Sequence, residues 1–344
     1  MKRKLIMLSG GFILSTLIVV ILYMIADYNS RHPNGFWRSV QQHRIDFVER
    51  FNIKNNSWYL TGRYDNRVLL RNTKIFNELL TVDFSLKDTG FKILSWPDTI
   101  KVFNGSNIVV DSPMVYVTDG VTPNIFSENL NTRQVATFSN PPFFTMALPV
   151  SANSFILRFA DSSSNNLLLK CASGLPLFYP QKNILTRQID GFFSTDGTFV
   201  KVPGTASFVY TYYYRNQFIV IDSSLNVIFE GKTIDTTTWA HIKIGTITSE
   251  GQTTMSAPPL FVNKETCASR DWLFVRSMLK ADNETESDFK NVSVIDVYSL
   301  KNGKYAFSVY IPDFNGFKIR DMKIFDNALF VLVDRYIYKY KLNF

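Results

Sequence analysis

The chain has 344 residues, a formal net charge of +8 and 46% hydrophobic residues. Apart from Lys2, Arg3 and Lys4, the positive charge is spread along the sequence, so no basic patch interleaved with aromatic residues predicts a nucleic-acid partner. Three histidines, two cysteines and no Cys-x-x-Cys pair argue against a zinc site. The sequence also lacks a phosphate-binding loop and a Gly-x-Ser-x-Gly elbow, so we assign no catalytic residue.

Residues 5–26 form an uncharged apolar run directly behind the three N-terminal cations. A run of this length can cross a bilayer as one helix, and it shows no polar stripe of the kind that faces water. By the positive-inside rule, residues 1–4 are expected in the cytoplasm and the chain after residue 26 in the periplasm. The sequence therefore predicts a single-pass protein of the inner (cytoplasmic) membrane.

A cleaved signal peptide is the alternative interpretation of residues 5–26. Its apolar region would be about 7–15 residues long and would end at a small-x-small cleavage site. The run is longer than that, and Met24 stands where a small residue should precede Ala26. No cysteine follows that could accept a lipid, so we favour an uncleaved anchor.

Residues 27–54 are expected to form a neck between the anchor and the following domain. Pro33, Asn34 and Gly35 are typical of a loop. Residues 36–51 space their apolar side chains among Arg, Gln and Glu in a way that predicts a short amphipathic helix. Such a helix would seat the domain against the membrane or cover one of its faces.

From residue 55 to residue 344 the sequence predicts short β-strands arranged in clusters. The 30 Phe and 16 Tyr of the chain suit strands, which favour aromatic and β-branched residues. Each cluster opens with a strongly apolar strand, and clusters of about 40–50 residues with several strands each are typical of propeller blades. The opening strands begin near residues 58, 114, 154, 207, 272 and 328.

These six clusters predict an all-β, six-bladed β-propeller over residues 55–344. The last cluster has two clear strands, so a strand near residue 53 could complete its blade and cover an otherwise exposed sheet edge. Seven blades remain an alternative if the long interval 211–272 contains a further strand cluster with a weak apolar pattern. Cys171 and Cys267 could form a disulfide in an exported domain, but nothing in the sequence pairs them.

Two segments give the sequence a resemblance to a known family. Residues 189–197, Ile-Asp-Gly-Phe-Phe-Ser-Thr-Asp-Gly, and the strand-rich residues 208–222 resemble exported six-bladed β-propeller proteins of the TolB-like type found in Bacteroidota. The resemblance covers about residues 55–344 and rests on strand and turn patterns. It implies the propeller fold and export, and it carries over no catalytic residue.

Oxygen-bearing side chains raise the question of a metal ion. Lactonase-like propellers hold calcium in the central tunnel with Glu, Asn and Asp, and such ligands suit a hard cation. Asp190, Asp235 and Asn263 are the candidates in this chain. Asp side chains at blade turns more often accept hydrogen bonds from backbone amides, so no cofactor is expected in the favoured interpretation.

A second group of residues suggests a recognition surface. Tyr212, Tyr214 and Arg215 belong to an aromatic cluster that ends in a cation, and Tyr and Arg are common at interface hot spots. His241, the one histidine after residue 54, could add a polar group nearby. The alternative is that this cluster packs between adjacent blades.

These observations together favour a non-enzymatic binding or scaffold module anchored in the membrane. Its partner would be a protein, a peptide or an envelope component, and the anchor would also suit a subunit of a membrane complex. The alternative function is a calcium-dependent propeller hydrolase of the lactonase-like type. The sequence does not identify the partner.

Overall fold

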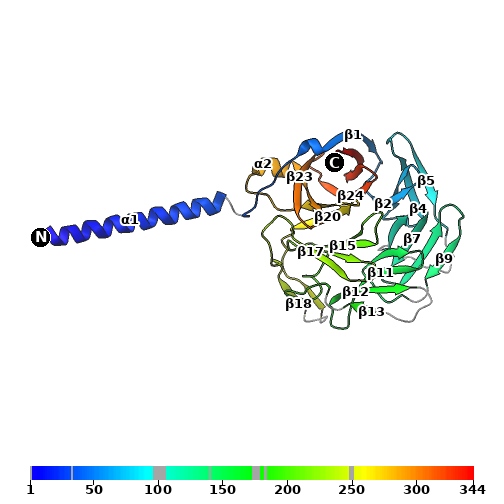
Figure 1. Cartoon of the computed structure of the whole chain (residues 1–344), viewed down its shortest axis with the longest axis horizontal. Helices are drawn as coiled ribbons and strands as arrows, with labels where there is room; N and C mark the ends of the chain where they lie inside the picture. The colour runs from blue at the N-terminus through cyan, green and yellow to red at the C-terminus, as the bar shows by residue number, and fades with distance from the viewer. Residues whose placement is uncertain are drawn as a thin grey trace.

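Short apolar strands joined by tight turns fold into antiparallel sheets that surround a central axis (Figure 1). This computed structural model describes residues 2–31, 34–95, 106–138, 141–172, 179–181, 184–247 and 252–344. Within these residues there are six sheets of four strands each. The chain is a six-bladed β-propeller, as the strand clusters predicted.

Each of the first five blades uses four strands that follow one another along the chain. Blade one holds β2 (Trp58–Tyr64), β3 (Arg67–Asn72), β4 (Glu78–Asp83) and β5 (Thr89–Ile93), and blade two holds β6 (Asn107–Asp111), β7 (Met114–Asp119), β8 (Asn124–Asn129) and β9 (Val135–Phe138). Blade three holds β10 (Met146–Ser151), β11 (Ser154–Ala160), β12 (Asn166–Ala172) and β13 (Tyr179–Gln181), and blade four holds β14 (Gly197–Lys201), β15 (Ser207–Tyr212), β16 (Phe218–Asp222) and β17 (Val227–Gly231). Blade five holds β20 (Asn263–Ala268), β21 (Trp272–Ser277), β22 (Val292–Ser299) and β23 (Tyr305–Pro312).

Blade six joins the two ends of the chain. It holds β24 (Ile319–Phe325), β25 (Ala328–Val333) and β26 (Tyr336–Leu342), and β1 (Ile45–Asn52) adds the fourth strand by pairing antiparallel with β26. The innermost strands β2, β6, β10, β14, β20 and β24 contact one another in sequence, and β24 contacts β2, so the ring closes. The closing strand expected near residue 53 thus exists and ends one residue earlier.

The helix predicted over residues 36–51 is wrong. The segment contains a short 3₁₀ turn (Gln42–Arg44) followed by β1, and Val40 forms a bridge with Ser308 at the edge of blade five. The pattern misled because β1 carries a bulge between Phe47 and Glu49, which breaks the strict alternation of a strand. Residues from Asn34 onward are therefore built into the propeller, ahead of the boundary expected at residue 55.

The long interval before blade five holds a two-stranded hairpin. Strands β18 (Ile244–Ile247) and β19 (Gln252–Met255) pair with each other and join no blade. A short helix, α2 (Glu286–Lys290), lies between β21 and β22. Cys171 and Cys267 are buried as free thiols in blades three and five. Burial raises the pKa of the Cys171 thiol to about 12.

The core consists of apolar side chains that fill the seams between neighbouring blades. Leu60 and Leu70 of blade one pack against Phe330 and Leu332 of blade six, and each of the other blades contributes to a similar cluster. In five blades the strongly apolar strand that opens each cluster in the sequence is the second strand. It is the most buried because strands cover both of its edges and blades cover both of its faces.

Gly62 sits where two innermost strands approach closely. A Cβ at this position would lie 2.5 Å from Val110 Cβ and 2.6 Å from the Val110 carbonyl oxygen. Gly62→Ala should therefore lower stability by about 1–3 kcal/mol, because β2 and β6 must separate. Gly90→Ala is the control, since its Cβ would meet the flexible Thr81 hydroxyl at 3.3 Å. Equal shifts of the melting temperature in the two variants would contradict this explanation.

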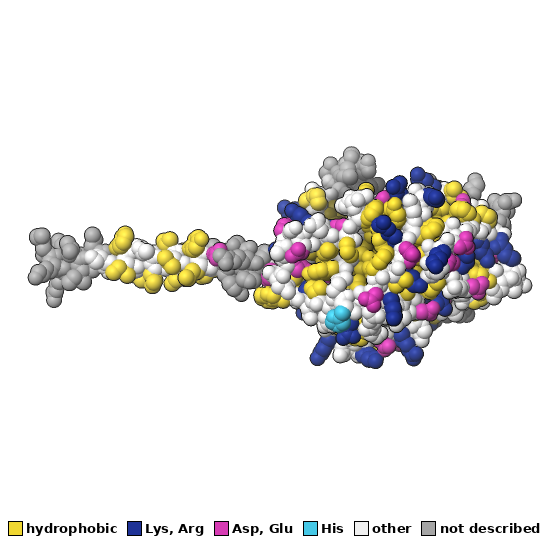
Figure 2. All heavy atoms as spheres, turned by 90° about the horizontal axis from the view of Figure 1, so that it is seen from above, with side chains coloured by type: hydrophobic (Ala, Val, Ile, Leu, Met, Phe, Trp, Pro, Cys, Tyr) yellow, Lys and Arg dark blue, Asp and Glu magenta, His cyan; other side chains and the backbone are white. Residues whose placement is uncertain are grey.

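Helix α1 (Lys2–Arg31) stands away from the propeller (Figure 1). Its described middle portion exposes apolar side chains around the helix (Figure 2). Within the described residues, no helix is both long enough and apolar enough to cross a membrane.

Candidate binding site

One face of the disc is defined by the strand directions. Every innermost strand begins at this face, and every second strand, which runs antiparallel to it, ends there. We call it the entry face. The loops that bring the chain into each blade lie here, together with the loops that join second to third strands. Loops of this kind carry binding residues in many folds.

Three arginines occupy the same place near the entry face in alternate blades. Arg71, Arg158 and Arg276 each follow three apolar residues near the end of a second strand, in blades one, three and five. The matching residues in blades two, four and six are Thr118, Thr211 and Leu332. The three arginines therefore occupy equivalent positions in their blades, so their partners can be compared directly.

Arg158 is fully neutralised by its neighbours. Its Nη1 donates to Asp196 Oδ1 at 2.6 Å and to the Tyr210 hydroxyl at 2.9 Å, and its Nε donates to Thr145 Oγ1 at 2.8 Å. Burial opposes the charge, yet Tyr210 and Asp196 hold the pKa of Arg158 above its usual value. This arginine ties blade three to blade four.

Arg276 has a similar structural role in blade five. Its Nη1 donates to Glu265 Oε2 at 2.8 Å and to the Ile319 carbonyl oxygen. Glu265 lies in a bulge of β20, and Ile319 begins the innermost strand of blade six. Arg276 therefore links neighbouring innermost strands, whose edges have no sheet partner in the ring.

Arg71 differs from the other two arginines. Within the described part of the chain its guanidinium forms no hydrogen bond and no ion pair, and it lies 5.3 Å from the centre of the Tyr59 ring. Arg320 lies 4.9 Å from the same ring centre. Burial lowers the pKa of both arginines, so the nearby groups do not fully compensate their charge.

Arg320 is held by two backbone carbonyls. Its Nε donates to the Asp334 oxygen at 2.8 Å and its Nη1 to the Trp58 oxygen at 2.5 Å, while its Nη2 is buried without a partner among the described residues. Asp321 accepts a hydrogen bond from the Leu60 amide at 2.7 Å and forms no ion pair with a described arginine. Burial raises the pKa of the Asp321 carboxyl to about 6.

The expected recognition surface at Tyr212, Tyr214 and Arg215 is wrong, because these side chains are buried. Their residues are 0%, 4% and 1% exposed. Arg215 lies 3.6 Å from the Tyr212 ring centre and donates to the Thr186 carbonyl oxygen at 2.8 Å. The cluster packs inside the propeller, as the alternative interpretation held, whereas His241 is exposed on a loop of the entry face.

The three candidate calcium ligands serve backbone groups and one hydroxyl. Asp190 accepts from the amides of Phe193 and Ser194, and Asn263 donates to the Tyr212 and Arg215 carbonyl oxygens. Asp235 accepts from the Thr233 hydroxyl and the Thr237 amide. In the described ranges no group of three or more His, Cys, Asp or Glu side chains is arranged to hold a metal ion.

Large apolar side chains are exposed in the loops of the entry face. In the described parts of these loops eight such side chains are exposed, whereas the described loops of the opposite face expose none. The eight are Ile75, Val121, Phe143, Ile189, Phe192, Trp239, Leu260 and Phe317. Exposed apolar side chains gathered on one face are typical of a surface that contacts a partner.

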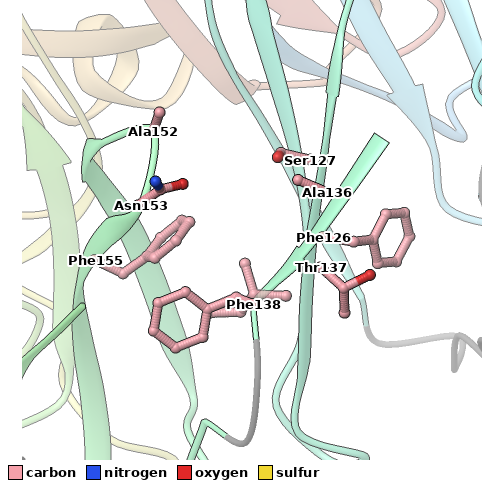
Figure 3. Close-up of a pocket in the computed structure, with 9 residues that line it drawn as sticks. Phe126, Ser127, Ala136, Thr137, Phe138, Ala152, Asn153 and Phe155 are labelled. Atoms are coloured by element: carbon pink, nitrogen blue, oxygen red, sulfur yellow. The ribbon is translucent and has the colours of Figure 1, made fainter. Parts of the chain in front are cut away.

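The pockets between strands are small. One lies between blades two and three, where Phe138 and Phe155 face each other and Phe126 points away (Figure 3). Its volume of about 20 Å³ suits a single water molecule. A second cavity of about 200 Å³ is lined by polar residues, among them Gln217, Glu230 and Lys232. Neither pocket includes the arginines near the entry face.

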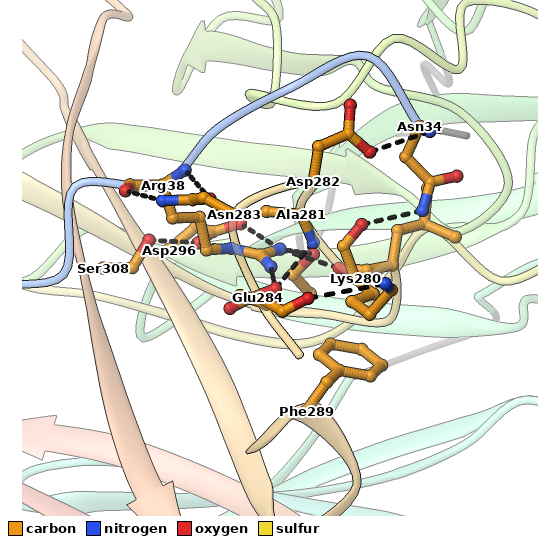
Figure 4. Close-up of polar contacts among 12 residues, drawn as sticks. Asn34, Arg38, Lys280, Ala281, Asp282, Asn283, Glu284, Phe289, Asp296 and Ser308 are labelled. Carbon is orange, nitrogen blue, oxygen red and sulfur yellow. Dashed lines mark hydrogen bonds and ion pairs between the residues drawn. The ribbon is translucent and has the colours of Figure 1, made fainter. Parts of the chain in front are cut away.

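A buried polar cluster fixes the segment between α1 and β1 (Figure 4). Arg38 donates to Glu284 Oε2 at 2.5 Å and to Asp296 Oδ1 at 2.9 Å, and these side chains are at most 3% exposed. The Asn34 and Gly35 amides donate to Asp282. We call this group of six residues the Arg38 clasp. It attaches the chain to blade five beside the entry-face loops.

Sequence reasoning missed the arginines of the entry face. The available signal was the recurring pattern of three apolar residues and an arginine, as in Val68–Arg71, Phe155–Arg158 and Leu273–Arg276. The pattern locates the arginines, but their partners come from elsewhere in the chain. Only the structure separates Arg71 from Arg158 and Arg276.

Comparison with known proteins shows the fold. No protein-family model matches the chain, and no curated protein matches its sequence. A solved structure of a DUF4221 family member from Bacteroides vulgatus is similar with a TM-score of 0.51 and 12% identity, covering 88% of this chain and 99% of the other. A protein named as exported, from Bacteroides fragilis, gives a TM-score of 0.51 and 10% identity, covering 89% and 97%.

An inactive virginiamycin B lyase variant from Staphylococcus aureus, solved with quinupristin, is also similar. Its TM-score is 0.50 at 13% identity, covering 87% of this chain and all of the other. At such identities the likenesses support the propeller fold and carry no activity. The TolB-like type remains a prediction.

Proposed function

We propose that this protein is a membrane-anchored, extracytoplasmic propeller that binds a protein, peptide or envelope component through its entry face. The carrying observation is the asymmetry of exposed apolar side chains between the two described faces. A closed ring presents such side chains on a fixed frame, so little order is lost when a partner binds. No observation among the described residues favours the calcium-dependent hydrolase as a second candidate.

The N-terminal segment supports the anchor. The apolar run follows three cations, and the described part of α1 exposes its apolar side chains instead of packing them against the propeller. Arg31 ends α1, and Asn34 is already held by Asp282 and by Thr236. The three Cα–Cα steps from Arg31 to Asn34 span at most about 11 Å, so the anchor would keep the propeller close to the membrane surface.

Membrane association can be tested with a matched pair of substitutions. Ile18 on α1 and Ile228 on β17 are 50% and 54% exposed. Lysine in the middle of a membrane-spanning helix costs about 2.5–3.5 kcal/mol. Ile18→Lys should therefore reduce the fraction of the protein that resists alkaline carbonate extraction, while Ile228→Lys should not. Extraction of the unmodified chain by carbonate would contradict the anchor, and a fused periplasmic reporter that stays inactive would contradict the orientation.

Partner binding can be tested by photo-crosslinking in intact cells. A crosslinking residue at Phe143 or Trp239, both exposed on the entry face, should give the same discrete adduct. The same residue at Ser224, in a turn of the opposite face, is the control and should give none. Adducts of equal yield at all three positions would contradict a specific entry-face partner.

A further inference from the structure

Arg71 and Arg320 form a cationic site beside Tyr59, in which no carboxylate pairs with either positive charge among the described residues. Both guanidinium groups lie within 5.3 Å of the same ring centre, and neither has a carboxylate at ion-pair distance among the described residues. An aromatic face attracts a cation, but this attraction is weaker than a charge-assisted hydrogen bond to a carboxylate. The two charges are therefore held partly out of water without a carboxylate partner among the described residues.

The related arginines show what is missing. Arg158 meets Asp196 and Tyr210 across the seam to the next blade. At the seam that follows Arg71, the described chain before β6 begins with Ser106, which is neutral, and its hydroxyl is buried without a described partner. The residue that corresponds to Tyr210 in the second strand of blade two is Val117, which cannot donate or accept a hydrogen bond. Where Arg158 has a carboxylate, Arg71 has none in the described chain.

We propose that Arg71, together with the neighbouring Arg320 and Tyr59, binds an oxyanion group of the ligand at the entry face, either a carboxylate or a phosphate. The planar guanidinium of Arg71 can donate two parallel hydrogen bonds to such a group. Its half-buried position leaves it reachable, while Arg320, which lies 4.9 Å from the centre of the same Tyr59 ring, adds positive charge nearby. Asp321 lies close enough to influence both arginines, and because its pKa is raised to about 6, its negative charge is reduced in mildly acidic solution.

Arg71 is the residue whose substitution tests oxyanion binding without disturbing the fold. Its side chain forms no hydrogen bond with the described chain, so Arg71→Met should fold normally. Arg320 instead holds two backbone carbonyls, and its removal would confuse binding with stability. Arg63 provides the matched control, because it lies at the end of β2 away from Tyr59, is paired with Asp326 on the surface, and its loss changes the net charge equally.

The test is calorimetric titration of the full chain in detergent, at low ionic strength, with inorganic phosphate and separately with acetate. We expect saturable binding of at least one probe, weakened about tenfold or more by Arg71→Met and unchanged by Arg63→Met. Stronger binding of phosphate would indicate a phosphorylated ligand, and stronger binding of acetate a carboxylate. Thermal unfolding confirms that both variants are folded.

Two results would overturn this proposal. One is the absence of saturable binding of either probe to the unmodified chain, and the other is equal weakening in the Arg71 and Arg63 variants. The oxyanion site rests on the proposed binding function of the entry face, because it states the chemistry of the ligand. The experiments can nevertheless refute the site and the function separately. Photo-crosslinking can succeed without an oxyanion site, and oxyanion binding can be measured without a partner protein.

Discussion

Removal of residues 1–52 should leave a chain that does not close into a folded propeller. Strand β1 supplies the fourth strand of blade six and pairs with β26 along most of its length. Ile45 is buried in the core at the seam with blade five, and the Phe47 ring contacts Tyr338 and Tyr340. Losing a buried Ile costs about 2–5 kcal/mol, before the lost strand pairing is included.

That loss is large compared with the total stability of a domain, about 5–15 kcal/mol. It also exposes the edge of β26, which can then pair with other chains. Circular dichroism and size-exclusion chromatography should show an unfolded or aggregated product. A chain that starts at Asn34 is the control, since it loses α1 but keeps the Arg38 clasp and β1. A melting temperature for residues 53–344 within a few degrees of that control would contradict the role of β1.

The sequence predicted the blades through their most buried strands. Strand β25, Ala-Leu-Phe-Val-Leu-Val, is buried along its whole length, so it appears as one apolar run. The neighbouring innermost strand β24 carries Arg320, Asp321 and Lys323 and a bulge, and no simple alternation reveals it. The number of blades could therefore be predicted, while the innermost strand of blade six could not.

The polar residues were harder to place because their partners are distant in sequence. Arg38 looked like part of an exposed amphipathic segment, yet Glu284 and Asp296, more than 240 residues later, bury it. Arg215 looked like an exposed cation at the end of a strand, but Tyr212 and the carbonyl oxygen of Thr186 enclose it. Burial of a charge depends on tertiary contacts, and composition and spacing do not contain them.

Replacement of Arg38 by methionine should destabilise the propeller by about 3–5 kcal/mol, the usual cost of removing one partner from a buried ion pair. Arg38 contacts both Glu284 and Asp296, and its Nη2 also donates to Ser277 Oγ and the Leu279 oxygen. Burial opposes its charge, but Asp296 and Glu284 hold the pKa of Arg38 above its usual value. Without the guanidinium, two buried carboxylates lose the ion-pair partner that they have among the described residues.

Chemical denaturation of the single variant and of a neutralised triple variant separates charge from packing. Arg38→Met combined with Glu284→Gln and Asp296→Asn should recover part of the lost stability, because no unpaired charge remains. The surface variant Arg67→Met, which loses the pair with Asp88 and hydrogen bonds to the Thr81 hydroxyl and to the Thr81 and Asp88 carbonyl oxygens, should change stability by only about 1 kcal/mol. If Arg38→Met is as mild as Arg67→Met, the clasp does not hold the N-terminal segment to blade five, and the position of the anchor beside the entry face loses its physical basis.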